Sequence, residues 1–156
     1  MTKKTTKETN MLALDNQFCF ALYSASLALT KTYKPLLEAL NLTYPQYLVM
    51  LVLWEQDDVL VKEIGQALFL DSGTLTPLLK RLESAGLLIR QRDAQDERQV
   101  RILLTPEGKQ LRKAAMAIPP QIVCASGQTL ETLISLRQQL NDLREELHGE
   151  STDQIA

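Results

Sequence analysis

Apolar residues recur at spacings of three and four over much of the chain, which is the period of one face of an α-helix. The stretch from Leu12 to Leu40 shows this spacing, and Pro35 is expected to kink or divide the predicted helix. A second helix is predicted from Tyr44 to Trp54, with Thr43 as its N-cap residue and a proline tolerated in its first turn. The N-terminal part of the chain is therefore expected to be helical.

The middle of the chain alternates short elements. The expected order is a minimal strand over residues 59–61, a helix over 62–68, a helix from Asp71 or Thr74 to about Ala85, and strands over 87–92 and 99–104 joined by a polar loop. Pro77 is comfortable only in a first helical turn, so this helix is expected to begin near Thr76 or to have a distorted start. Residues 59–104 together predict a winged helix-turn-helix.

Two more helices are expected after the wing. Thr105 and Pro106 have the residue types of an N-cap and a first helical position, and this helix is predicted to run to about Ile118, where Pro119-Pro120 interrupts it. A last helix is predicted from Leu130 to Leu147. We expect one domain over residues 12–148, a disordered head over 1–11 and a flexible tail over 149–156. The outer helices, 12–40 and 105–148, carry apolar stripes that a small winged domain cannot cover, so a symmetric homodimer is predicted.

Composition narrows the class of protein only slightly. The chain is 45% hydrophobic and 23% charged, which is ordinary for a globular protein. No apolar run is long enough to span a bilayer, and no apolar segment of a secretory signal follows the polar N-terminus. We therefore expect a cytoplasmic protein without a membrane partner.

The formal net charge of −2 hides an uneven distribution. Between Thr74 and Lys113 nine basic residues face five acidic ones, whereas acidic residues are in excess after Gln128. The basic residues are Lys80, Arg81, Arg90, Arg92, Arg98, Arg101, Lys109, Arg112 and Lys113. A local positive field attracts phosphates whatever the total charge. An ordinary mixed-charge surface would give the same counts, so charge alone does not decide whether this stretch binds nucleic acid.

The second helix of a helix-turn-helix places its N-terminal residues at the base edges of the DNA major groove. Here that end carries Ser72, Thr74 and Thr76, whose short hydroxyl side chains allow close approach to DNA, and Lys80 and Arg81 follow one to two turns later. A surface amphipathic helix would explain the leucines of this segment. It would not explain a second face that is rich in hydroxyl groups and then basic.

The predicted wing carries Arg98 at its tip, two residues after Asp96. An arginine on a hairpin can enter a narrow minor groove, where the negative potential is enhanced. Asp96 is then expected to accept hydrogen bonds within the loop and to orient Arg98. The alternative is an ordinary surface ion pair, which contributes ~0–1 kcal/mol.

These segments resemble the MarR family of regulators. The resemblance lies in the recognition-helix sequence DSGTLTPLLKRLE at residues 71–83, in Arg92-Asp93 with Asp96-Glu97-Arg98, and in LTPEG at residues 104–108. It covers nearly the whole chain. It implies a mainly α-helical, homodimeric winged-helix fold that binds double-stranded DNA at an inverted-repeat operator, usually as a repressor.

The chain has two cysteines, Cys19 and Cys124, and no CxxC motif. Cys19 lies between Phe18 and Phe20, where a cysteine is either a packed small hydrophobe or a reactive thiol. A reactive thiol needs hydrogen-bond donors nearby. Tyr33 is 14 residues further along, roughly 21 Å in a continuous helix, so it can reach only the Cys19 of another chain.

This constellation is similar to the organic hydroperoxide resistance repressors (OhrR), a subgroup of the MarR family, and to their two-cysteine type. The resemblance implies that peroxide oxidises Cys19 to a sulfenic acid. It implies further that Cys124 of the other subunit then reacts with this sulfenic acid to form an inter-subunit disulfide. It also implies a sensor pocket, whose members would be Phe18, Tyr23, Tyr33 and Tyr44. Organic hydroperoxide would then be the inducer.

The same sequence features leave other functions to consider. The main alternative is a MarR-type repressor relieved by a small aromatic ligand, with Cys19 only packed. A thiol peroxidase is disfavoured because the chain lacks a CxxC motif and a βαβ pattern, and a dimeric scaffold would leave the basic helix and wing unexplained. Two distant cysteines and the single His148 do not make a metal site, so neither a metal, a cofactor nor a catalytic residue is predicted.

Overall fold

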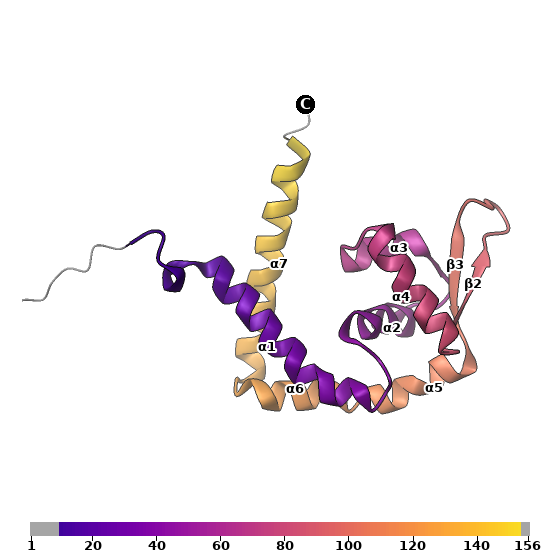
Figure 1. Cartoon of the computed structure of the whole chain (residues 1–156), viewed down its shortest axis with the longest axis horizontal. Helices are drawn as coiled ribbons and strands as arrows, with labels where there is room; N and C mark the ends of the chain where they lie inside the picture. Colours follow the sequence, from indigo (N-terminus) through magenta and orange to yellow (C-terminus); the bar gives the residue numbers. More distant parts are fainter. Residues whose placement is uncertain (1–9, 154–156) are drawn as a thin grey trace, which may run out of the picture. The chain divides into compact units, whose positions relative to one another are not determined.

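The computed structural model describes residues 10–153, with side chains up to residue 149. The chain divides into two compact units, Met1–Arg112 and Lys113–Ala156, and the boundary falls within a helix. The predicted head lies outside the described residues except for residues 10 and 11. Figure 1 gives the order of the elements along the chain.

The first helix is shorter than predicted. A short 3₁₀ helix, η1 (Leu14–Asn16), precedes α1 (Phe18–Glu38). The break occurs because Gln17 is extended, and its side-chain amide donates to the carbonyl oxygens of Met11 at 2.6 Å and Ala13 at 3.0 Å. Pro35 lies inside α1, so of the two effects predicted for this proline, a kink or a division of the helix, the division is wrong.

Helix α2 (Tyr44–Glu55) begins where the sequence predicts. Thr43 and Gln46 form a capping box: the Thr43 hydroxyl accepts from the Gln46 backbone N–H at 3.4 Å, and the Gln46 side-chain oxygen accepts from the Thr43 N–H at 2.9 Å. This reciprocal cap fixes the start of α2 and places its apolar face in the core.

The winged helix-turn-helix is confirmed. It consists of β1 (Val59–Leu60), α3 (Val61–Leu68), α4 (Ser72–Ser84), β2 (Leu88–Arg92) and β3 (Val100–Leu104). The strands form an antiparallel sheet in the order β1-β3-β2, in which Val59 pairs with Ile102 and Leu88 pairs with Leu104. The β2–β3 hairpin extends beside α4 as the wing (Figure 1).

The core of the first unit joins α1, α2, α3, α4 and the sheet. Its most buried side chains are Leu37, Val49, Met50, Leu53, Ile64, Leu75, Leu79, Leu82, Leu88 and Ile102. Because the leucines of α4 fill this core, the opposite face of α4 is held towards solvent. The fold therefore positions a polar helix face beside an exposed hairpin.

The remaining helices are α5 (Pro106–Ala115), α6 (Ile118–Ser126) and α7 (Leu130–Asp153). The sequence missed α6, because Pro119-Pro120 lie in its first turn and begin this helix after the preceding one has ended. Helix α7 continues beyond the predicted end at Leu147, into the segment predicted as a tail. None of the helices among the described residues is long and apolar enough to cross a membrane.

Candidate nucleic-acid interface and cysteine site

The start of α4 is exposed and rich in hydroxyl groups. Asp71 caps the helix, and its Oδ1 accepts from the Thr74 backbone N–H at 2.7 Å, which holds the pKa of this carboxyl below its usual value. The side chains of Ser72 and Thr74 are exposed, and the half-buried Thr76 donates to the Ser72 carbonyl oxygen at 2.7 Å. The helix begins at Ser72, so the predicted N-cap at Asp71 is confirmed and the alternative of a start near Thr76 is wrong; Pro77 lies within the second turn.

Basic side chains follow on the same helix. Lys80 and Arg81 are exposed, whereas Leu75, Leu79 and Leu82 are each 1% exposed. The helix therefore presents hydroxyl groups at its N-terminal end and positive charge further along, while its apolar face is fully buried. This is the arrangement required of a helix that approaches phosphates and base edges.

Asp96 organises the tip of the wing. Its Oδ1 accepts from both the backbone N–H and the Nε of Arg98, at 3.1 Å each, and its Oδ2 accepts from the Gln99 side-chain amide at 3.2 Å. These donors lower the pKa of Asp96, with the Gln99 bond making the largest contribution. The Arg98 side chain is nevertheless 91% exposed, so its guanidinium projects into solvent from a fixed base.

The base of the wing depends on residues that the sequence analysis did not select. Arg101 donates to Asp58 Oδ1 at 2.7 Å and to Asp93 Oδ2 at 3.0 Å, and Asp93 also accepts from the backbone N–H groups of Gln95 and Asp96. The two carboxylates raise the pKa of Arg101. The resulting network ties the hairpin to the turn before β1. Arg101 and Asp58 lie 43 residues apart, so no local sequence pattern indicates their contact.

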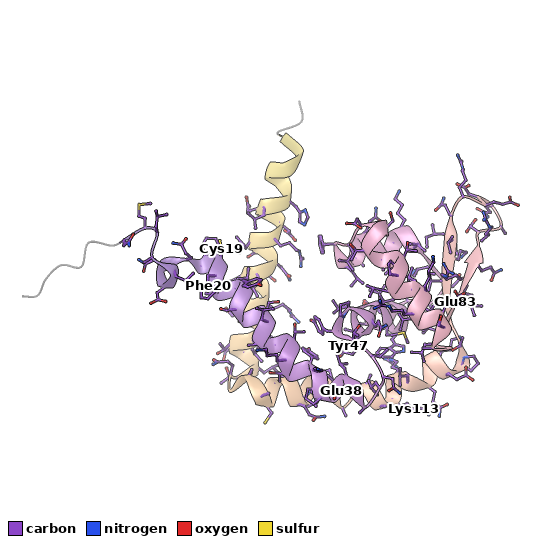
Figure 2. All side chains as sticks on the ribbon, viewed as in Figure 1. Cys19, Phe20, Glu38, Tyr47, Glu83 and Lys113 are labelled. Carbon is purple, nitrogen blue, oxygen red and sulfur yellow. The ribbon has the colours of Figure 1, made fainter. Side chains whose placement is uncertain are left out.

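Cys19 lies in the first turn of α1 and is exposed (Figure 2). Its neighbours Phe18 and Phe20 are 65% and 40% exposed, and Tyr23, one turn later, is 62% exposed. Cys19 is therefore not a core residue within its own chain. It belongs to an apolar face that the described part of one chain leaves uncovered.

The rings of Tyr33, on α1, and Tyr44, on α2, lie close together within one chain. Their ring centroids are 4.7 Å apart. Tyr47 completes the cluster, at 5.9 Å from Tyr33 and 6.3 Å from Tyr44. Burial raises the pKa of Tyr33 to about 12, with Tyr44 and Tyr47 adding to the shift, and burial also raises the pKa of Tyr44. The hydroxyl groups of both residues are protonated at neutral pH, as tyrosine hydroxyl groups ordinarily are.

The sequence analysis missed Tyr47, which is 3% exposed and lies one turn after Tyr44 on α2. That i, i+3 spacing was the available signal, since residues three apart on a helix share a face. Its role in the cluster follows only from the packing of α2 against α1.

The second cysteine, Cys124, lies in α6, within the second unit, and is exposed. Pro119-Pro120, which the sequence predicts as a break, belong to the same helix as Cys124. No group of three or more metal-ligating residues occurs among residues 10–153.

Comparisons with known proteins agree with this architecture. Residues 31–115 match the family described as transcriptional regulator SarA/Rot. The chain is 51% identical to the organic hydroperoxide resistance transcriptional regulator of Bacillus subtilis, over 88% of this chain and 93% of that protein. It is also 51% identical to the HTH-type transcriptional regulator TtmR of Methylorubrum extorquens, over 88% of this chain and 70% of the relative.

Solved structures show the same similarity. Reduced AbfR bound to DNA superposes with a TM-score of 0.73 at 36% identity, covering 86% of this chain and 94% of AbfR. Disulfide-formed AbfR gives a TM-score of 0.60 at 39% identity, covering 83% and 91%. Overoxidised AbfR bound to DNA gives 0.70 at 38% identity, covering 85% and 93%.

The fold and these similarities define a winged-helix transcription regulator and not an enzyme. The chain belongs to the SarA/Rot regulators and, as the sequence motifs predict, to the MarR family and its organic hydroperoxide resistance (OhrR) branch.

Proposed function

We propose that this protein is a redox-sensing repressor that binds an inverted-repeat operator as a homodimer and releases it when an organic hydroperoxide oxidises Cys19. Oxidation is followed by a disulfide between Cys19 and Cys124 of the partner subunit. The observation that carries the proposal is the exposed Cys19 thiol on an uncovered apolar face of α1, in a regulator of the OhrR branch.

DNA binding rests on α4 and the wing. The exposed hydroxyl groups of Ser72 and Thr74, with Thr76 behind them, approach the major groove, and Lys80 and Arg81 contact phosphate or guanine. Arg98 extends from the hairpin towards the minor groove. The AbfR and MepR relatives have been solved in complexes with DNA, which supports the same activity here.

A homodimer accounts for the exposed apolar side chains. On α1 these include Phe18, Leu22, Tyr23, Leu27 and Leu29, which are 42–65% exposed in the single chain. Helix α7 also exposes Ile134, Leu136, Leu140 and Leu147. Surfaces of this extent mark interaction sites, and a symmetric pair covers the same face on both chains.

The dimer also supplies the donors that the thiol needs. Helix α1 is continuous from Phe18 to Glu38, so Cys19 and Tyr33 of one chain are separated by roughly 21 Å at 1.5 Å per residue. The hydroxyl groups of Tyr33 and Tyr44 therefore donate hydrogen bonds to the Cys19 sulfur of the partner subunit. Tyrosine hydroxyl groups are protonated at neutral pH, so both can donate to a thiolate and stabilise it.

The chemistry is a two-electron oxidation. The Cys19 thiolate attacks the distal oxygen of the hydroperoxide, the O–O bond breaks, and the alcohol leaves after taking up one proton. The thiolate of Cys124 from the other subunit then attacks the sulfenic sulfur. The S–S bond forms, the S–O bond breaks, and the leaving hydroxide takes up one proton to become water. The apolar side chains of Phe18 and Phe20 favour an organic hydroperoxide over hydrogen peroxide.

Operator release follows from geometry. Two recognition helices bind half-sites about 34 Å apart, so a shift of a few ångströms prevents simultaneous engagement. The relative AbfR has been solved as a disulfide-formed protein and, when overoxidised, in a complex with DNA. These structures support the disulfide, and not oxidation of the thiol alone, as the step that converts the DNA-bound form of the repressor into the released form.

The test is operator binding by the purified dimer before and after cumene hydroperoxide and again after dithiothreitol. We expect release on oxidation and rebinding on reduction, whereas Cys19→Ser binds the operator and keeps it under peroxide. Cys124→Ala is the matched control and forms no covalent dimer on a non-reducing gel. Release of Cys19→Ser by peroxide would refute the sensor, and release of the reduced wild type by phenolic ligands would support the ligand-controlled alternative.

A further inference from the structure

Trp54, the single tryptophan of the chain, joins two regions that the proposed function needs to connect. It lies near the end of α2, where its ring packs edge-on against Tyr47 with the centroids 6.4 Å apart. Its indole N–H donates to the carbonyl oxygen of Gly108 at 2.8 Å. Trp54 and Gly108 are 54 residues apart in sequence, so this bond fixes α2 to the start of α5.

On one side of Trp54 lies the tyrosine cluster. Tyr47, on α2 (Figure 2), is in contact with the ring of Tyr33 at 5.9 Å and with the ring of Tyr44 at 6.3 Å between centroids. Tyr47 is buried, so its ring cannot move without displacing its neighbours. A shift of either sensor tyrosine is therefore passed to Tyr47 and from there to Trp54.

On the other side lies the end of the recognition helix. The Gly108 N–H donates to the Thr105 hydroxyl at 3.0 Å, and this hydroxyl donates to the Gly86 carbonyl oxygen at 2.6 Å. Gly86 follows the end of α4 and has a φ of 75°. A Cβ on Gly108 would collide with the carbonyl oxygen of Leu87. Gly108 is thus pressed against the backbone that leaves α4 and enters β2.

We propose that Tyr47 and Trp54 are the positioning residues that transmit the redox state of the sensor to α4 and the wing. The inference rests on the proposed function and deepens it by naming the route within one subunit. Formation of the disulfide takes the Cys19 sulfur of the partner subunit away from the hydroxyl groups of Tyr33 and Tyr44. The rings of these two tyrosines then rearrange, and Tyr47 displaces Trp54. Through its hydrogen bond to Gly108, Trp54 shifts the backbone that follows the end of α4.

The route has a built-in spectroscopic probe, because indole emission depends on the hydrogen bond and packing of the ring. Wild-type protein treated with cumene hydroperoxide is expected to shift its tryptophan emission in step with disulfide formation and to recover it after dithiothreitol. Cys19→Ser should show no shift. Operator release by the wild type with unchanged Trp54 emission would overturn the proposal.

A functional test uses Trp54→Phe, which keeps an aromatic ring against Tyr47 and removes the N–H donor. The matched control is Leu53→Met, a neighbouring buried position that makes no side-chain hydrogen bond. We expect reduced Trp54→Phe to bind the operator within about threefold of wild type and to form the disulfide at the wild-type rate. The ratio of reduced to oxidised operator affinity should fall by about tenfold, while Leu53→Met keeps the wild-type ratio.

The outcomes separate the two proposals. If Trp54→Phe releases the operator on oxidation as the wild type does, the transmission route is wrong and the redox sensor stands. If Cys19→Ser is also released by peroxide, the sensor itself is wrong. A merely structural role for Trp54 would weaken operator binding by the reduced form or slow disulfide formation, and either result would contradict the assignment. The emission measurement on the wild type holds even if the variant fails to fold.

Discussion

The Asp96 carboxylate binds Arg98 twice, through the backbone N–H and through Nε, with both distances 3.1 Å. The two terminal nitrogens of the guanidinium take no part in these two bonds. The Arg98 side chain is 91% exposed, so the guanidinium projects from the wing. An exposed ion pair contributes little to stability. The pair instead restricts where the guanidinium lies before it meets DNA.

Arg98→Ala is therefore expected to weaken operator binding about tenfold, or ~1.4 kcal/mol, without changing the melting temperature. Asp96→Asn should have a smaller effect, because the arginine remains but is less well oriented. Fluorescence anisotropy with a labelled operator measures both. Arg137→Ala, an exposed arginine on α7, is the control and should bind normally. Equal losses for Arg98→Ala and Arg137→Ala would show that only general charge is involved.

Lys80 and Arg81 are expected to contribute through phosphate contacts. Each alanine substitution should weaken binding to operator and to unrelated DNA alike, and should reduce the slope of log K against log salt by about 1. Titrations at several salt concentrations provide the slope. An unchanged slope together with a loss confined to the operator would mean that the side chain contacts bases.

Gly108 cannot accept a side chain at its present position. Gly108→Ala places a Cβ against the Leu87 carbonyl oxygen and 3.1 Å from Leu104 Cδ2, so we expect a loss of ~1–3 kcal/mol in the free energy of unfolding. Gly149→Ala is the matched control on α7, where nothing lies within 4 Å of the added methyl group. That substitution should be neutral or stabilising by roughly 0.5–1 kcal/mol. Denaturant unfolding compares the two, and an equal effect would contradict the close packing at Gly108.

The sequence predicts much of this fold because the decisive signals are local. The Thr43 cap, the Thr105-Pro106 helix start and the polar loop between the two wing strands each act over a few positions, and the order of the elements follows from them. The sequence is a poorer guide at the prolines. Pro77 is expected to mark a helix start, but the helix begins several residues earlier. Pro119-Pro120 are expected to interrupt a helix, but they lie in the first turn of one.

The missed site residues have partners far away in the sequence. Arg101 contacts Asp58, 43 residues away in sequence, and Trp54 donates to Gly108, 54 residues away. Tyr47 gains its place in the cluster only when α2 packs on α1. These contacts depend on tertiary structure, and only Tyr47 leaves a periodic signal, its i, i+3 spacing from Tyr44. The residues of α4 proposed to face DNA can instead be selected from the helix pattern alone.

The raised pKa of Tyr33 gives a pH prediction. The unfolded tyrosine ionises near 10 while the folded hydroxyl stays protonated to about 12, so its contribution to stability is fully present below pH 10 and is lost as the pH rises towards about 12. The free energy of unfolding should therefore fall less steeply over this interval in Tyr33→Phe than in the wild type. Denaturant unfolding at alkaline pH measures the difference, and parallel curves would contradict the buried environment of Tyr33.

The central claim is that the disulfide joins different subunits, and a hybrid dimer tests it directly. A dimer of one Cys19→Ser chain and one Cys124→Ser chain retains a single cysteine of each kind, on opposite subunits. Cumene hydroperoxide should convert this hybrid to a covalent dimer on a non-reducing gel and release the operator, while neither parent homodimer forms the crosslink. A hybrid that stays uncrosslinked and DNA-bound, while the oxidised wild type loses its thiols yet migrates as a monomer, would contradict the account.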